Sequence, residues 1–219
     1  MSVQYPGESA PYRTARNALL AEEVALRQQI EKVAELRRQL PPGGATADYT
    51  FTAPDQTATA MTDLFTTPRN TLAVYSLMYR PDAASPCPMC VSLLDGLAGQ
   101  ACHVGQRVDL VVVSAATPQQ LHVLSEARGW SELRLFSTQG TTYQRDYHAE
   151  APDGSQLPMM NVFRKTPQGI HHTWGSESFY ADIDGQPRHV DQLWPLWSVL
   201  DLTPDGRGTD WYPALSYAS

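Results

Sequence analysis

The sequence has few basic residues and no long apolar run. Lysine and arginine together number 16 against 23 acidic residues, so the formal net charge is −7. Proteins that bind nucleic acids or anionic membrane surfaces rely on an excess of basic side chains, which this chain lacks. No segment approaches the roughly 20 apolar residues that a membrane-spanning helix requires. We therefore expect no nucleic-acid partner and no membrane partner.

Cysteine is also scarce, and no targeting signal is evident. The first residues, Met1 to Ala18, lack the apolar run of a secretory signal. Three cysteines, Cys87, Cys90 and Cys102, are too few for a disulfide framework in a chain of 219 residues. In a reducing compartment, a Cys-x-x-Cys pair is more often redox-active or metal-binding than structural. These features predict a cytoplasmic protein.

A long amphipathic helix is expected over residues 12–40. Apolar residues recur there every seven positions, at Leu19, Leu26, Val33 and Leu40. The Pro-Pro-Gly-Gly run 41–44 then ends the helix. Two interpretations remain open. The apolar positions either close one face of the core, or they pair with the same helix of a second copy and make a homodimer.

Strand and helix signals alternate from residue 71 onward. The apolar run 72–79 and the β-branched run 108–114 both have strand length. Residues 91–101 read as a helix between them, and Thr117 is expected to cap another helix that ends at Gly129. Because crossovers between parallel strands are right-handed, this order predicts a parallel strand–helix–strand unit.

The later part of the chain predicts an antiparallel hairpin. Two extended runs, 159–165 and 170–174, are joined by a segment of turn composition, and 133–137 reads as one more strand. A parallel unit followed by an antiparallel hairpin is the layout of a thioredoxin-like α/β fold. We expect a three-layer sandwich with a long N-terminal helix and a C-terminal extension.

This fold prediction divides the chain into three parts. Residues 1–46 form the N-terminal helical extension, residues 47–193 form the thioredoxin-like domain, and residues 194–219 form a C-terminal tail that wraps the surface.

The motif Cys87-Pro88-Met89-Cys90 follows the first predicted strand and begins a helix. A thiolate at a helix N-terminus is stabilised by unpaired backbone N–H groups and by the helix dipole, so its pKa falls. Cys90 lies one turn further along and can attack a mixed disulfide on Cys87. We predict Cys87 as the attacking thiolate and Cys90 as the resolving thiol. Pro88 fits the first helical turn, where no N–H is needed.

A second segment is expected to face this motif. Pro158 precedes the strand-like run 159–163, and a cis Leu157–Pro158 bond would present backbone groups opposite Cys87. We therefore predict Pro88, Leu157 and Pro158 as substrate-binding residues.

Other interpretations of the cysteines are less favoured. Zinc requires four ligands, and only the adjacent pair Cys102 and His103 could complete a site with the motif. An inert, packed pair is also open. We expect no metal and no cofactor, and we expect Cys102 to be a buried free cysteine at a helix end.

Several segments resemble the bacterial thioredoxin-like proteins grouped as the domain-of-unknown-function 899 family. The resemblance runs from about Arg16 to Tyr212. It includes Asp48–Phe51, Val112–Ala115 and, as its core, Val74–Tyr79 leading to Cys87–Cys90. The last segment of the resemblance, Leu200–Arg207, is unusual in composition and specific. The resemblance implies a thioredoxin-like domain with an N-terminal helical extension, and it implies no established substrate.

Three functions remain open. The leading one is thiol–disulfide exchange with a protein or a low-molecular-weight thiol or disulfide partner. A peroxiredoxin-type peroxidase is the alternative, but its Pro-x-x-x-Thr-x-x-Cys pattern would need Pro and Thr where Arg80 and Ala84 precede Cys87. The third is a non-catalytic binding protein with the same fold. The tryptophan-rich tail could also cover the motif.

Overall fold

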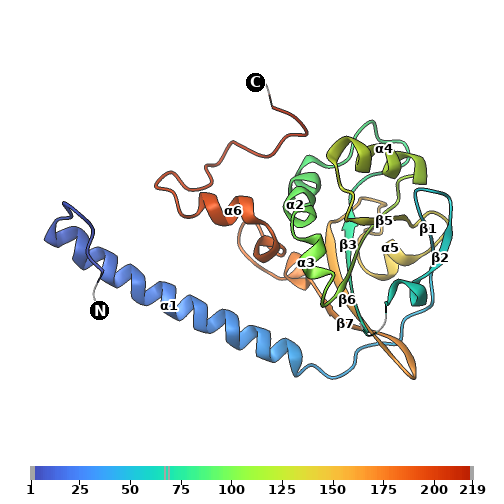
Figure 1. The fold of residues 1–219 in the computed structure, drawn as a ribbon, viewed down its shortest axis with the longest axis horizontal. Coiled ribbons are helices and arrows are strands. Elements are labelled where there is room, and N and C mark those ends of the chain that lie inside the picture. Colours follow the sequence, from blue (N-terminus) through green and yellow to red (C-terminus); the bar gives the residue numbers. More distant parts are fainter. Residues whose placement is uncertain (1–2, 67, 69, 218–219) are drawn as a thin grey trace. The chain divides into compact units, whose positions relative to one another are not determined.

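A computed structural model gives the structure of residues 3–66, 68 and 70–217 (Figure 1). The described structure divides into two compact units, Met1–Pro41 and Pro42–Ser219. The predicted domain boundaries at residues 46 and 193 stay predictions. In the described part of the chain, no helix combines the length and the apolar composition needed to cross a bilayer.

The first unit consists mainly of α1 (Ala10–Arg38). Ser9 caps it, since the Ser9 hydroxyl accepts a hydrogen bond of 3.3 Å from the backbone N–H of Tyr12. The predicted long helix is confirmed, two residues earlier at each end. None of its residues is buried, and both interpretations of its apolar positions stay predictions.

The described residues of the second unit form a seven-stranded sheet in the order β2-β1-β5-β4-β3-β6-β7. Its strands are β1 (Thr50–Thr52), β2 (Ala58–Ala60), β3 (Thr71–Leu77), β4 (Asp109–Ser114), β5 (Arg134–Ser137), β6 (Met159–Thr166) and β7 (Gly169–Gly175). The central strands β3, β4 and β5 are parallel, whereas β6 pairs antiparallel with both β3 and β7. The predicted parallel unit and the predicted hairpin are therefore both confirmed.

Helices connect the parallel strands. α2 (Pro88–Ala98) and α3 (Ala101–Val104) join β3 to β4, and α4 (Pro118–Arg128) joins β4 to β5. The predicted cap of α4 forms a capping box, in which the Thr117 hydroxyl accepts from the N–H of Gln120 at 3.2 Å. Gly129 ends α4 at φ +66°, a conformation that favours glycine.

Two apolar clusters lie on opposite faces of the sheet and make the three layers. The first joins inward side chains of β3 and β4 to α2, α4 and α6 (Pro195–Leu200). The second lies around Phe51 and Tyr143, which come from β1 and from α5 (Tyr143–Asp146), and includes the 3-10 helix η1 (Met61–Leu64). With the sheet topology, these layers make the fold a thioredoxin-like α/β sandwich (Figure 1).

The C-terminal region is more ordered than the sequence pattern indicates. It contains η2 (Glu177–Tyr180), η3 (Asp191–Leu193) and α6. Trp194 and Trp197 are 7% and 6% exposed and pack into the first apolar cluster. The Trp194 indole N–H donates to the hydroxyl of Ser92 in α2 at 3.2 Å. The segment predicted as a wrapping tail thus begins with core residues.

The segment 43–46 runs beside β7. The N–H of Gly43 donates to the carbonyl of His172 at 3.1 Å, and the N–H of Thr46 donates to the carbonyl of Ile170 at 2.8 Å. A Cβ atom at Gly43 would lie 2.3 Å from the His172 carbonyl oxygen. Only glycine fits at that position, so the close approach of this segment to β7 depends on Gly43.

The prediction that Cys102 is buried is wrong. Cys102 is exposed, whereas its neighbour Ala101 is 7% exposed and packs against the core. The short helix α3 directs Ala101 inward, and the next residue on a helix lies about 100° further round. Helical periodicity over four residues is too short to be read from sequence, which explains the error.

Candidate active site

The dithiol lies at the start of α2, after the loop that connects β3 to this helix. A loop follows Leu77 and is closed by a hydrogen bond of 3.0 Å from the N–H of Cys87 to the carbonyl of Met78. Cys87 is the N-cap residue of α2, with extended backbone angles of φ −61° and ψ 120°, and Pro88 is the first helical residue. The Cys87 sulfur therefore lies at the carboxyl edge of the parallel strands, where sheets of this kind place their ligands.

The two cysteines differ in exposure. Cys87 is partly exposed, whereas Cys90 is 1% exposed and belongs to the first apolar cluster. Both are free thiols in the structure. An incoming reagent can reach only the Cys87 sulfur. The Cys90 sulfur is covered by the protein and is accessible only to Cys87.

The protonation of the pair is unequal. The Cys90 thiol donates a hydrogen bond to the Cys87 sulfur, and this lowers the pKa of Cys87 to about 6 despite partial burial. The N–H groups of Cys90 and Met89 also favour the thiolate, although neither makes a cap hydrogen bond of regular geometry. The same thiol-to-thiolate bond, together with burial, raises the pKa of Cys90. At neutral pH the proton stays on Cys90 and the charge on Cys87.

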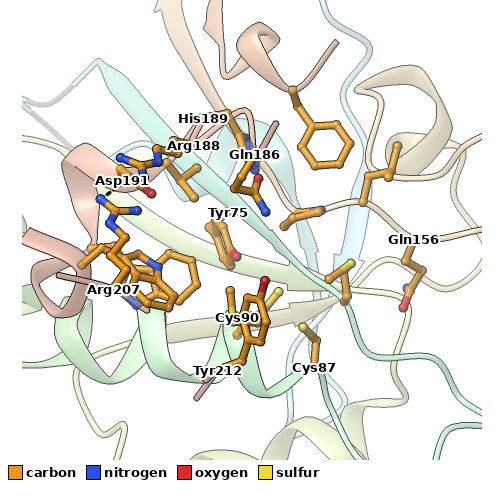
Figure 2. A pocket seen from close by; sticks show the side chains of 18 of the residues that line it. Tyr75, Cys87, Cys90, Gln156, Gln186, Arg188, His189, Asp191, Arg207 and Tyr212 are labelled. Atoms are coloured by element: carbon orange, nitrogen blue, oxygen red, sulfur yellow. Dashed lines mark ion pairs between the residues drawn. The ribbon is translucent and has the colours of Figure 1, made fainter. Parts of the chain in front are cut away.

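Tyr75 supports the buried thiol from the sheet. It lies on β3, is 1% exposed, and its hydroxyl donates to the Cys90 sulfur (Figure 2). That hydrogen bond opposes the rise in the pKa of Cys90, because it stabilises the thiolate form. Tyr75 is therefore a positioning residue for the second sulfur.

Replacement of this tyrosine tests its role. We expect Tyr75→Phe to slow the attack of Cys90 on a mixed disulfide at Cys87 by about tenfold, since a hydrogen bond to a charged group contributes about 1.5–3 kcal/mol. The pH dependence of that second step should move to higher pH, and the first step should stay within about twofold. Rapid quenching and intact mass measure both steps. An unchanged second step would remove Tyr75 from the site.

A cavity of about 390 Å³ opens beside the dithiol. Tyr75, Cys87 and Cys90 line it together with residues from the segments 156–158 and 179–212 (Figure 2). Six aromatic side chains line it: Tyr75, Phe179, Trp194, Trp197, Trp211 and Tyr212. The C-terminal segment thus covers part of the motif, and the cavity lies between this segment and the two cysteines.

We call the lining residues between 179 and 212 the C-terminal wall of the cavity. Several charged side chains lie there. The Arg207 guanidinium pairs with Asp191 at 2.7 Å and with Asp201 at 2.6 Å, and it lies 5.3 Å from the centre of the Trp197 ring. Arg188 and His189 also line the cavity. His189 Nδ1 lies 3.1 Å from the hydroxyl oxygen of Ser176, and burial lowers the pKa of His189.

The predicted site residues fall into two groups. Cys87, Cys90, Leu157 and Pro158 all line this one cavity. Pro88 is not among the described residues that line it. In the described part of the chain, no group of three or more His, Cys, Asp or Glu side chains is arranged to hold a metal ion.

The sequence interpretation missed Tyr75, Arg188 and His189 as neighbours of the dithiol. Tyr75 reads as one more residue of a buried strand, and the C-terminal residues lie about 100 positions away from the motif. The signals available were the unusual composition of the segment 200–207 and its tryptophan-rich surroundings. Neither signal could be connected with Cys87 without the fold.

Comparison with solved structures gives distant similarities. A peroxiredoxin-like protein from Aquifex aeolicus is 13% identical, with a TM-score of 0.47, over 62% of this chain and 75% of that one. Peroxidoxin BcpB from Mycobacterium tuberculosis is 14% identical, with a TM-score of 0.47, over 72% and 96%. The exposed lipoprotein thioredoxin Etrx1 from Streptococcus pneumoniae is 10% identical, with a TM-score of 0.45, over 68% and 99%.

Comparison at the level of sequence identifies the family. No curated protein matches the chain. The profile of a family described as bacterial proteins of unknown function, DUF899, matches residues 2–217. The match includes the dithiol, the strands that carry it and the C-terminal wall of the cavity. The chain therefore belongs to the DUF899 family of bacterial proteins.

Proposed function

We propose that this protein is a thiol–disulfide oxidoreductase that uses Cys87 and Cys90. One observation supports the proposal above all: a partly exposed Cys87 whose pKa is lowered to about 6 lies in front of a buried Cys90 that keeps its proton. A thiolate present at neutral pH is the nucleophile of disulfide exchange, and a second thiol within reach completes the reaction.

The proposed reaction has two steps. The Cys87 thiolate attacks one sulfur of a substrate disulfide, so a mixed disulfide forms and one substrate thiolate leaves. Cys90 then loses its proton and attacks the Cys87 sulfur, which forms the Cys87–Cys90 disulfide and releases the second thiolate. Two electrons pass from the protein to the substrate. The proton that Cys90 loses and one proton from solvent convert the two leaving thiolates to thiols. A dithiol reductant restores the reduced protein.

The pKa of Cys87 provides the test. We expect the alkylation rate of Cys87 by iodoacetamide to rise with pH about a midpoint near 6, because only the thiolate reacts and its fraction grows as pH passes the pKa. Cys90 should stay unmodified in the native protein, since it is buried and its pKa is raised. Peptide mass spectrometry after a timed quench reports each cysteine separately. A midpoint near the ordinary ~8.5 would overturn the proposal.

Two variants serve as controls for this measurement. Cys102→Ser removes the exposed third thiol and should leave the profile of Cys87 unchanged. Cys90→Ala removes the donor that contributes most to the low pKa of Cys87, so its midpoint should move upward. If the midpoint stayed in place without Cys90, the thiolate would owe its stability to another group.

A further inference from the structure

The cavity beside the dithiol has the size of a small-molecule site. Its volume of about 390 Å³ lies in the range of about 300–1,000 Å³ that is typical of such sites. The Cys87 sulfur belongs to its lining, so a molecule that enters the cavity meets the attacking atom. The cavity therefore suits a small disulfide as the substrate of Cys87.

Aromatic rings make up much of the lining. Trp197 packs edge-to-face against Trp194 and Trp211, with ring centres 5.5 and 6.2 Å apart. Trp211 and Tyr212 are 43% and 61% exposed, so part of each ring surface is open to a ligand. A planar aromatic ligand packs edge-to-face or offset against such rings. Further apolar side chains complete the lining: Met78, Met89, Leu157, Pro158 and Val190.

The charged side chains of the C-terminal wall are matched among themselves. Arg207 lies between Asp191, at 2.7 Å, and Asp201, at 2.6 Å. Asp201 also interacts electrostatically with Arg188, and its pKa is lowered by the hydrogen bond from Arg207 and by the charges of both guanidiniums. Burial lowers the pKa of His189, so that side chain is neutral at pH 7. Two guanidiniums thus share two carboxylates and leave no surplus charge for an ionic substrate.

The reacting sulfur itself disfavours an anionic substrate. Cys87, with a pKa of about 6, is a thiolate at neutral pH and adds a negative charge to the cavity. An anionic group close to it is repelled, and solvent screens that repulsion only weakly in a partly buried place.

A cationic substrate meets a different obstacle. The guanidinium of Arg207 already lies over the Trp197 ring, 5.3 Å from its centre, so the ring face that could bind a cation is taken. A second cation would also leave water for a wall whose carboxylates are already paired. An uncharged apolar body avoids these costs and gains free energy from leaving water.

We infer that the cavity is a binding site for a small, uncharged aromatic disulfide. Its rings pack against Trp211 and Tyr212 of the C-terminal wall, and its disulfide lies against the Cys87 sulfur (Figure 2). The inference rests on the proposed function, because the reaction is the same exchange: Cys87 attacks one substrate sulfur, Cys90 closes the protein disulfide, and the substrate takes up two electrons and two protons and leaves as two thiols.

The test uses the whole chain, reduced with dithiothreitol and freed of excess reductant. Single-turnover rates are measured at neutral pH with dithiodipyridine, which is aromatic and uncharged, dithiobis(nitrobenzoate), which is aromatic and anionic, hydroxyethyl disulfide, which is aliphatic and uncharged, cystamine, which is aliphatic and cationic, and insulin. Each rate is divided by the rate of the same disulfide with dithiothreitol, which corrects for its intrinsic reactivity. We expect dithiodipyridine to give the highest ratio, about tenfold above that of dithiobis(nitrobenzoate).

A matched pair of tyrosine variants tests the aromatic wall. Tyr212→Ala should lower the ratio for dithiodipyridine by roughly threefold to tenfold and leave that for hydroxyethyl disulfide within about twofold. Tyr217→Ala removes an equally exposed tyrosine, 63% against 61%, that is not among the described residues lining the cavity. It should change neither ratio.

A gain of activity tests the charge balance. Asp201→Asn removes one of the two carboxylates that neutralise the guanidiniums, at a side chain that is 44% exposed and lies outside the described lining of the cavity. The ratio for dithiobis(nitrobenzoate) should rise about threefold, as expected for one partly exposed ion pair, whereas that for dithiodipyridine should stay within about twofold.

The outcomes distinguish the two proposals. A ratio for dithiobis(nitrobenzoate) or cystamine that equals or exceeds that of dithiodipyridine would overturn the preference for an uncharged substrate. Equal effects of Tyr212→Ala and Tyr217→Ala would overturn the aromatic wall as the binding surface. An insulin ratio as high as that of dithiodipyridine would overturn the assignment of the cavity, while exchange at the dithiol would stand. If no disulfide oxidised the protein and no Cys87–Cys90 bond formed, the proposed function itself would fail.

Discussion

The Cys87→Ser variant should reduce disulfides no faster than buffer, a loss of at least about a thousandfold, as expected for removal of a catalytic nucleophile. A serine hydroxyl is not ionised near neutral pH and does not attack a disulfide. Cys90 cannot take over, because it is 1% exposed and its pKa is raised. Thiol release from a small disulfide, followed in a stopped-flow instrument, measures the loss.

In the Cys90→Ala variant, the reaction should stop at the mixed disulfide. In Cys90→Ala the first step remains possible, so the protein should accumulate a mixed disulfide at Cys87 and release one thiol per chain instead of two. Intact mass before and after reduction identifies that adduct. Cys102→Ser is the matched control and should retain full activity, because Cys102 is exposed on α3 and does not line the cavity. Activity that survived in Cys87→Ser would place the chemistry elsewhere.

The Trp197→Ala variant should lower the free energy of unfolding by about 3–5 kcal/mol, the range for truncating a buried aromatic side chain. Trp197 is 6% exposed, packs against Trp194 and Trp211, and carries the Arg207 guanidinium over its ring. Its loss leaves a cavity between α6 and α2 and removes the support of the C-terminal wall. Denaturant unfolding followed by circular dichroism measures the change.

An exposed residue on the same segment serves as the reference. Leu202 is 83% exposed, so Leu202→Ala should change the free energy of unfolding by no more than about 0.5 kcal/mol. If Trp197→Ala were as mild as Leu202→Ala, the C-terminal segment would not be part of the folded core.

The sequence predicts the central elements of the fold because their signals are local. The run Val111–Val113 is β-branched and buried on both faces, and the α4 helix carries both a capping box and a terminal glycine. Short elements escape such prediction. β2 has three residues and α5 has four, and their structure depends on partners elsewhere in the chain rather than on their own periodicity.

The candidate site, too, has a part that the sequence predicts and a part that it does not. The motif alone predicts the helix-capping position of Cys87, because strand, turn and helix follow one another along the chain. Arg188 and Trp211 lie about 100 or more residues away, and they reach the cavity only through the tertiary packing of the C-terminal segment, which includes the packing of α6 on α2. The burial of Tyr75 is predicted by its strand, but its contact with Cys90 requires the side-chain directions of the folded sheet.

The pairing of residues 43–46 with β7 has a practical consequence for shortened forms of the protein. An uncovered outer strand offers its free N–H and C=O groups to other chains and promotes aggregation. Removal of residues 1–41 keeps Gly43 and the segment 43–46 that covers β7. Removal of residues 1–46 also removes the N–H groups that donate to the carbonyls of Ile170 and His172. A fragment meant to stay monomeric at high concentration should therefore begin no later than Pro42.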